Sequence, residues 1–184
     1  MNTKQYNLLK LKSLKGCRLS IGKYPHFAYN GNGGGGTAIT TIDEEKEIQH
    51  VQFSPKTFFI PPMTWKNTRF LMLPLPPGLK IEMKMQSLEG IINKCSGEIS
   101  LDFESDFLFT IFSLIHFPKL VVKTSLVSTT TSSSLFNAKG MNLQKNGLTT
   151  LVGIALIPVT GNKILDYFLG LPNEALAILH CKIE

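Results

Sequence analysis

Four histidines and thirteen carboxylates are the side chains of this sequence best suited to acid–base or metal chemistry. The histidines, which share no metal-ligand spacing, are His26, His50, His116 and His180. His180 and Cys181 are neighbours, so in a strand they would face opposite sides. An enzymatic site would need two or more histidines and carboxylates to converge in one pocket of the folded chain. The sequence therefore assigns no catalytic residue and no metal site.

A glycine run satisfies the pattern GxGxxG at residues 31–36. In a dinucleotide-binding site this pattern opens a helix whose N-terminus faces the pyrophosphate. Here the β-branched residues 37–42 follow, which favour a strand, and no P-loop lysine is present. The run is interpreted as a flexible turn, and no nucleotide or other cofactor is expected.

A row of carboxylates alternates with apolar residues before the most apolar part of the chain. The row consists of Glu98, Asp102, Glu104 and Asp106. Carboxylates suit a hard cation such as Ca²⁺, but a solvated strand face gives the same alternation. We interpret the row as a solvated face, with Lys80 and Lys84 expected opposite it on a nearby strand, and predict no metal.

Three cysteines, Cys17, Cys95 and Cys181, are widely separated and form no CxxC pair. This spacing disfavours a disulfide framework and a local zinc site, and predicts free thiols in a reducing compartment. No N-glycosylation sequon is present. The apolar residues 107–127 are interrupted by His116, Pro118 and lysines, so no transmembrane helix is expected. We expect a soluble, intracellular protein.

The formal net charge of +6 arises entirely before Asp43, the first acidic residue. Residues 1–16 are predicted to be a flexible basic leader, and residues 17–184 a single β-rich domain. Contact of the leader with an anionic membrane surface is an alternative to simple solvation. It would use Lys4, Lys10, Lys12 and Lys15. Nucleic-acid binding is disfavoured because arginine, the better residue for phosphate and guanine contacts, occurs only twice.

A proline-rich segment, residues 61–78, contains the only tryptophan. Its apolar character predicts a structured crossover loop. Trp65, Lys66 and Arg69 could bind an anionic headgroup or an acidic peptide, since an aromatic ring and two cations suit such groups. Alternatively, Trp65 covers the core and the two cations are solvated. These three residues are a candidate ligand- or partner-binding group.

Strict alternation of apolar and charged residues begins at Leu79 and predicts a strand with one buried face. A hairpin follows over residues 88–103, and residues 107–114 are apolar on both faces. Small closed sheets can hold one apolar ligand in their interior. The candidate cavity-lining residues are Ile81, Met83, Phe103 and Phe109.

The remaining pattern indicates roughly nine strands separated by few helices, which favours antiparallel pairing. We therefore predict a mainly β fold, an antiparallel meander forming a barrel or a sandwich. One helix is predicted over residues 161–170 from its 3.6-residue spacing. Residues 174–179 favour a second helix, and the residues after them could be an edge strand.

Several short phrases resemble an uncharacterised family of cyanobacterial and plastid proteins. They are FSP at 53–55, FIPP at 59–62, LPLPPGLKIE at 73–82, LEG at 88–90, LVG at 151–153 and LP at 171–172. The resemblance covers roughly residues 20–180 and carries over no activity. It implies a photosynthetic setting, in a plastid or the cyanobacterial cytoplasm.

The function predicted from these observations is non-enzymatic binding of an apolar small molecule or lipid, or of a protein partner. The alternatives are a small cyclase- or isomerase-like barrel enzyme whose site is not visible in sequence, and a peripheral membrane protein. Convergence of the histidines and carboxylates would favour the enzyme. An apolar interior cavity would favour the carrier.

Overall fold

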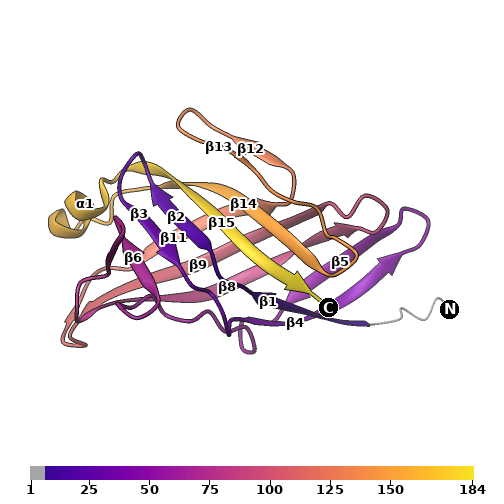
Figure 1. Cartoon of the computed structure of the whole chain (residues 1–184), viewed down its shortest axis with the longest axis horizontal. Helices are drawn as coiled ribbons and strands as arrows, with labels where there is room; N and C mark the ends of the chain where they lie inside the picture. Colours follow the sequence, from indigo (N-terminus) through magenta and orange to yellow (C-terminus); the bar gives the residue numbers. More distant parts are fainter. Residues whose placement is uncertain (1–6) are drawn as a thin grey trace.

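The computed structural model describes residues 7–184, and its main feature is a closed ring of eight antiparallel strands (Figure 1). The hydrogen-bonding order is β1-β4-β5-β8-β9-β11-β14-β15, and β15 pairs back to β1. The ring strands are β1 (Asn7–Ser13), β4 (Gly35–Asp43), β5 (Ile48–Phe53), β8 (Leu79–Asn93), β9 (Ile99–Ile111), β11 (Leu120–Val127), β14 (Leu148–Ile157) and β15 (Asn173–Ile183).

A second branch of the sheet leaves the ring at β15. The first half of β15 pairs with β2 (Cys17–Ile21), which continues through β3 (His26–Tyr29) and β6 (Thr68–Phe70) to β7 (Leu73–Pro74). The last residues of β15 pair with β1 instead. Two short additions complete the structure: β10 (Ile115–His116) on β9, and a hairpin of β12 (Thr130–Ser132) and β13 (Asn137–Lys139).

The predicted mainly β, antiparallel fold with one short helix near the C-terminus is confirmed. The helix α1 (Lys163–Leu169) begins where the Asn162 side chain accepts hydrogen bonds from two backbone amides of the first turn. It ends at Gly170, whose φ of 68° is the left-handed conformation that glycine adopts readily. No helix among residues 7–184 has the length and apolarity needed to cross a bilayer.

The predicted flexible leader is wrong for residues 7–13, which form β1. This strand is hydrogen-bonded on both sides, to β4 and to β15, and so closes the ring. Its residues Leu9 and Leu11 are buried in the core. Lys10 lies between them and is exposed, which is ordinary strand alternation. The prediction for residues 1–6 lies outside the described residues.

Other differences concern segments that have little regular pattern of their own. The proline-rich segment contains β6 and β7, and residues 58–60 form a single bridge at Phe59. Residues 107–111 belong to the long strand β9. The predicted helix at residues 174–179 is wrong, because both edges of β15 are hydrogen-bonded to neighbouring strands. Residues 128–134 are all serine or threonine, and three of them form the short strand β12.

The glycine run at residues 31–36 allows β4 to approach β1 closely. Gly35 is the first residue of β4, and a Cβ there would lie only 1.9 Å from the Leu11 carbonyl oxygen of β1. Its φ of 129° also disfavours other residues. A side chain at this position would separate β1 from β4, so the run is needed where the ring closes.

Two apolar clusters fill the space enclosed by the sheet. One lies between β1, β4, β5 and the adjoining halves of β8, β9, β14 and β15, and includes Val51, Phe53 and Leu101. The other lies between β2, β3, α1 and the remaining halves of the long strands, and includes Phe27, Phe109 and Leu169. The long strands contribute to both, so the two clusters form one continuous interior.

Candidate functional site

An apolar cavity of about 150 Å³ lies in the interior, enclosed by strands of the ring together with β2, β3 and residues 58–63. All four side chains predicted from alternation line it: Ile81 and Met83 from β8, and Phe103 and Phe109 from β9. The structure thus brings these four residues together in one cavity wall. Whether they hold a ligand stays a prediction.

Small side chains on β14 and β15 explain why the interior is not filled. Ala155 on β14, and Ala175 and Ala177 on β15, line the cavity. Gly153 also lines it but serves close approach to β11, because a Cβ there would lie 2.9 Å from Thr124 and Leu126. The aromatic side chains of β9 line the same cavity, and large groups facing small ones in a closed sheet leave room between them. Sequence reasoning missed these positions, although small residues at alternate places in two apolar strands were a usable signal.

The polar groups in the cavity wall are already hydrogen-bonded to the protein. Ser13 Oγ donates to the Gly31 carbonyl oxygen at 2.5 Å, and Thr124 Oγ1 donates to the Ile154 carbonyl oxygen at 2.8 Å. The Tyr29 hydroxyl donates to the Pro61 carbonyl oxygen. Within the described chain, no charged side chain lines the cavity. The wall therefore offers no partner for an ionised group.

The cysteines have the electrostatics of structural thiols. Burial raises the pKa of Cys17, and raises that of Cys181 to about 12. Cys95 is exposed, and the Glu47 carboxylate beside it raises its pKa as well. Nucleophilic thiols need a lowered pKa, so these positions disfavour thiol catalysis.

Ser105 is an exception to the general hydrogen bonding of the interior. It is fully buried in β9, and its Oγ is the one buried side-chain oxygen or nitrogen of the described chain without a protein partner. Alternation places it on the inward face between Phe103 and Phe107, both of which line the cavity. A buried hydroxyl without a partner is a position where a ligand oxygen or a water could bind.

A second pocket, an open cleft of about 430 Å³, lies outside the ring beside β14 and β15. Its polar centre is a pair in which Thr150 Oγ1 lies 3.0 Å from His180 Nδ1. A hydroxyl beside an imidazole could form part of a nucleophilic site, but a third group is needed to orient the base. The cleft has no carboxylate in its described wall, and Lys15 is its only charged residue.

The other histidines do not join this pair. His26 is exposed, and its Nδ1 lies 2.7 Å from Ser20 Oγ. His50 and His116 are exposed at other places on the surface. The described residues contain no group of three or more His, Cys, Asp or Glu side chains able to hold a metal ion. Of the four histidines, only His180 lines either the interior cavity or the outer cleft.

The carboxylate row of β9 is solvated and partly paired, as its alternation indicates. Glu104 and Asp106 lie 3.1 and 3.0 Å from Lys123 and Lys119, respectively. Lys80 and Lys84 do lie on the neighbouring strand β8, with Lys84 directly opposite Asp106. The ion pairs differ from the prediction, since Lys80 is paired with Glu82 on its own strand. Exposed pairs of this kind contribute little to stability.

The candidate group in the proline-rich segment is spread over the surface. Trp65 is exposed, and Lys66 Nζ lies 5.6 Å from the centre of its ring. Arg69 belongs to β6 and donates a hydrogen bond to the Met72 carbonyl oxygen at 3.3 Å. These contacts leave the cations solvated and form no enclosed site, so ligand binding by this group stays a prediction.

Three of the lysines proposed for membrane contact, Lys10, Lys12 and Lys15, are on or just after β1. Lys10 and Lys15 are exposed, whereas Lys12 is paired with Glu184 at 2.6 Å. Lys4 lies outside the described residues. The pairing of Lys12 removes one free positive charge from the set.

No family model, curated protein or solved structure matches the chain. The resemblance to cyanobacterial and plastid proteins, and the location it implies, therefore stay predictions. The candidate site of the described chain is therefore the uncharged, apolar interior cavity, with the unpaired Ser105 hydroxyl behind its wall.

Proposed function

We propose that the ring acts as a small barrel that binds an uncharged apolar molecule, or the apolar part of a larger one, in its interior. The observation that carries this proposal is the cavity wall, which is apolar apart from groups hydrogen-bonded within the protein. Apolar cavities of this size stay dry and can accept a benzene-sized molecule. A longer lipid or pigment would need neighbouring side chains to move.

The chemistry of the wall also restricts the class of ligand. An ionised carboxylate inside the ring would lose its hydration without gaining a cation, which is strongly unfavourable. Fatty acids held by a buried headgroup are thus disfavoured. An alcohol, ketone or quinone is better suited, because the unpaired Ser105 hydroxyl lies behind the wall on the inward face of β9 and would be reached if a neighbouring side chain moved.

Thermal unfolding with toluene and with benzoate tests the proposal, because the two probes have similar size and differ in charge. Toluene is expected to raise the Tm of the protein, whereas benzoate is expected to leave it unchanged. Ala155→Ile adds volume to the cavity wall and should abolish the toluene effect. Ala28→Ile, on the exposed face of β3, is the matched control and should retain it.

Native mass spectrometry of protein purified from its own source would identify the natural ligand. A co-purifying lipid, pigment or quinone that Ala155→Ile loses would support the proposal. If toluene has no effect on the wild-type protein and no apolar molecule co-purifies, the interior is only an imperfectly filled core. A protein partner would then be the better hypothesis.

A further inference from the structure

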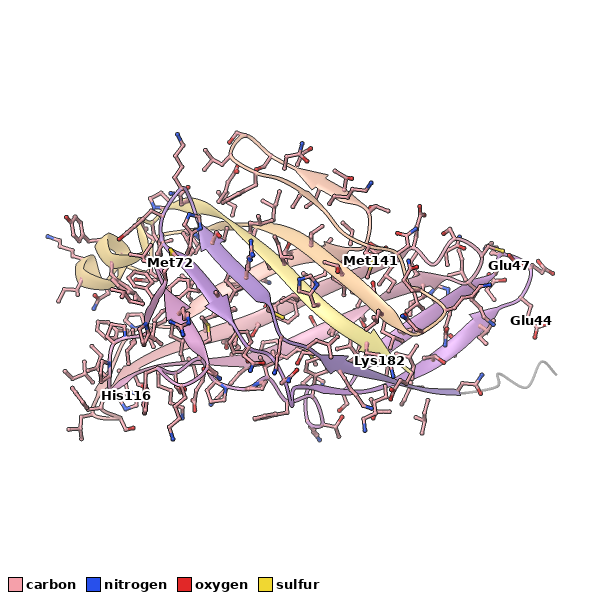
Figure 2. All side chains as sticks on the ribbon, in the orientation of Figure 1. Glu44, Glu47, Met72, His116, Met141 and Lys182 are labelled. Carbon is pink, nitrogen blue, oxygen red and sulfur yellow. The ribbon has the colours of Figure 1, made fainter. Side chains whose placement is uncertain are left out.

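Large apolar side chains are exposed together at one end of the molecule, which we name the apolar end. It comprises the β6–β7 turn, the β9–β10 turn and α1. Its most exposed residues include Tyr167 at 91%, Met72 at 88% and Leu114 at 83%. Figure 2 shows Met72 and His116 at this end, opposite Glu44 and Glu47.

Packing contacts hold these segments side by side. The rings of Phe70 in β6 and Phe168 in α1 are 5.4 Å apart, and the Phe70 ring lies 6.3 Å from that of Tyr24 in the β2–β3 turn. The Phe112 amide at the β9–β10 turn donates to the carbonyl oxygen of Gly78, which directly precedes β8. These contacts hold the two turns and α1 in place relative to one another, so the exposed side chains share one surface.

The two turns adopt a conformation that their residues disfavour. Leu71 and Met72 have φ angles of 52° and 69°, and Phe112 and Ser113 have 50° and 58°. These are four of the five non-glycine residues with positive φ in the described chain. Such turns normally contain Asn-Gly or Asp-Gly, which adopt positive φ readily and are polar. Leu71, Met72 and Phe112 do not favour the turn conformation, and they are not part of the buried core.

Cations surround the apolar residues. Each of the four segments at this end contains one cation. They are Lys23 in the β2–β3 turn, Arg69 in residues 69–78, Lys119 in residues 111–119 and Lys163 in residues 160–170. The charge of Lys119 is offset by Asp106 of β9 at 3.0 Å, so Lys23, Arg69 and Lys163 supply the positive excess. The single acidic residue within these four described segments is Asp166, which accepts hydrogen bonds from Thr160 and Gly161. The apolar end thus presents an apolar tip with a net positive rim.

We propose that the apolar end docks on an anionic lipid bilayer. The protruding turn residues would enter the interface, and the cations would face anionic headgroups. Tyr167 suits the headgroup level, since its ring is apolar and its hydroxyl is polar. The surface differs from the basic segment around β1 and needs no ligand in the ring.

Flotation with phosphatidylcholine vesicles containing about one third phosphatidylserine tests the docking surface. The protein is expected to bind these vesicles at low salt and to dissociate as salt screens the charges. Leu71→Asn combined with Met72→Gly should weaken binding about tenfold or more, while restoring favourable turn residues. Lys23→Gln combined with Lys163→Gln should weaken it about 25-fold, since each lysine contributes about fivefold.

Matched controls separate this surface from general stickiness and net charge. Leu8 and Ile39 are exposed, paired apolar residues on β1 and β4, and changing both to Asn should leave vesicle binding unchanged. Lys94→Gln combined with Lys145→Gln removes the same charge from exposed positions elsewhere and should also have little effect. Ala155→Ile should bind vesicles normally, which distinguishes failure of docking from failure of the cavity proposal.

Three results would overturn the inference. They are failure of the wild-type protein to float with the anionic vesicles, binding of the turn variant equal to that of wild type, and equal weakening of binding by both lysine pairs. Sedimentation velocity would detect a dimer. If the wild-type protein dimerises, the turn variant does not, and neither binds vesicles, the surface is an interface between two copies of the chain and membrane docking is excluded.

Discussion

The two ends of the ring use opposite turn chemistry. At the end marked by Glu44 and Glu47, the β4–β5 turn is acidic, and the β8–β9 turn is stabilised by its own polar groups. There the Asn93 side chain accepts hydrogen bonds from the amides of Cys95 and Ser96, and Gly97 takes the positive φ. At the apolar end the positive-φ positions are occupied by Leu71, Met72, Phe112 and Ser113, three of which are large and apolar.

This difference indicates that the turns of the apolar end are not optimised for folding. A left-handed conformation costs a non-glycine residue about 1–2 kcal/mol, and exposed apolar groups gain nothing from burial. At the acidic end the β8–β9 turn has neither disadvantage, because Gly97 takes the positive φ, and Glu47 is the single non-glycine residue of that end with a positive φ in the described chain. Strain and exposed apolar area at the same place are what a binding surface shows when it is free of its partner.

The largest expected effect concerns the attachment of α1 to the apolar end. Leu169 is fully buried, and Leu169→Ala should reduce the free energy of unfolding by about 3 kcal/mol through loss of contacts and a residual cavity. Ile164→Ala, on the exposed side of the same helix, should change it by less than about 0.5 kcal/mol. Chemical denaturation measures both. Similar values for the two variants would mean that α1 does not anchor this end.

The strained turn should respond in the opposite direction. Leu71→Asn with Met72→Gly is expected to raise the free energy of unfolding by about 2 kcal/mol, because both new residues accept positive φ. Glu47→Gly at the acidic end changes a single such residue and should raise it by about half as much. Urea denaturation of the two variants compares the ends directly. Destabilisation by the double change would contradict the assignment of strain.

The next prediction concerns the interior between the two ends, where the Ser105 hydroxyl is buried without a partner. Ser105→Ala removes a buried hydroxyl without a partner and should raise the free energy of unfolding of the empty protein by about 1 kcal/mol. If the natural ligand uses this hydroxyl, the same change should weaken binding of that ligand. Ser125→Ala is a contrasting control, because its hydroxyl is exposed and bonded to Asp102. A loss of stability in Ser105→Ala would indicate an ordered water.

The smallest expected effect is a pH dependence at the seam between β1 and β15. Hydrogen bonds from Lys12 and Lys182 lower the pKa of Glu184 from its ordinary 4.5 to about 2. Because the folded-state pKa is the lower one, the stabilisation is present above about pH 4.5 and is lost as the pH falls toward 2. Glu184→Gln should therefore flatten the Tm profile in this window. An unchanged profile would mean that the pairs do not persist in solution.

Much of the ring could be predicted because its strands have clear local patterns. Alternation in β8 and β9 identified Ile81, Met83, Phe103 and Phe109, which face one cavity. The same sequence showed the helix through its spacing and its terminal glycine. These features depend on neighbours two to four residues away, which a sequence displays directly.

The tertiary structure decided the features that depend on distant partners. Residues 174–179 resemble a helix, yet β15 is a strand because β14 and β2 satisfy its backbone on both sides. β1 resembles a charged leader, yet it closes the ring because Gly35 lets β4 approach it. The apolar end combines segments from residues 23 to 170. Sequence fixes each strand's inward face through local periodicity, whereas closure of the ring and the grouping of its turns require hydrogen bonds and packing between remote segments.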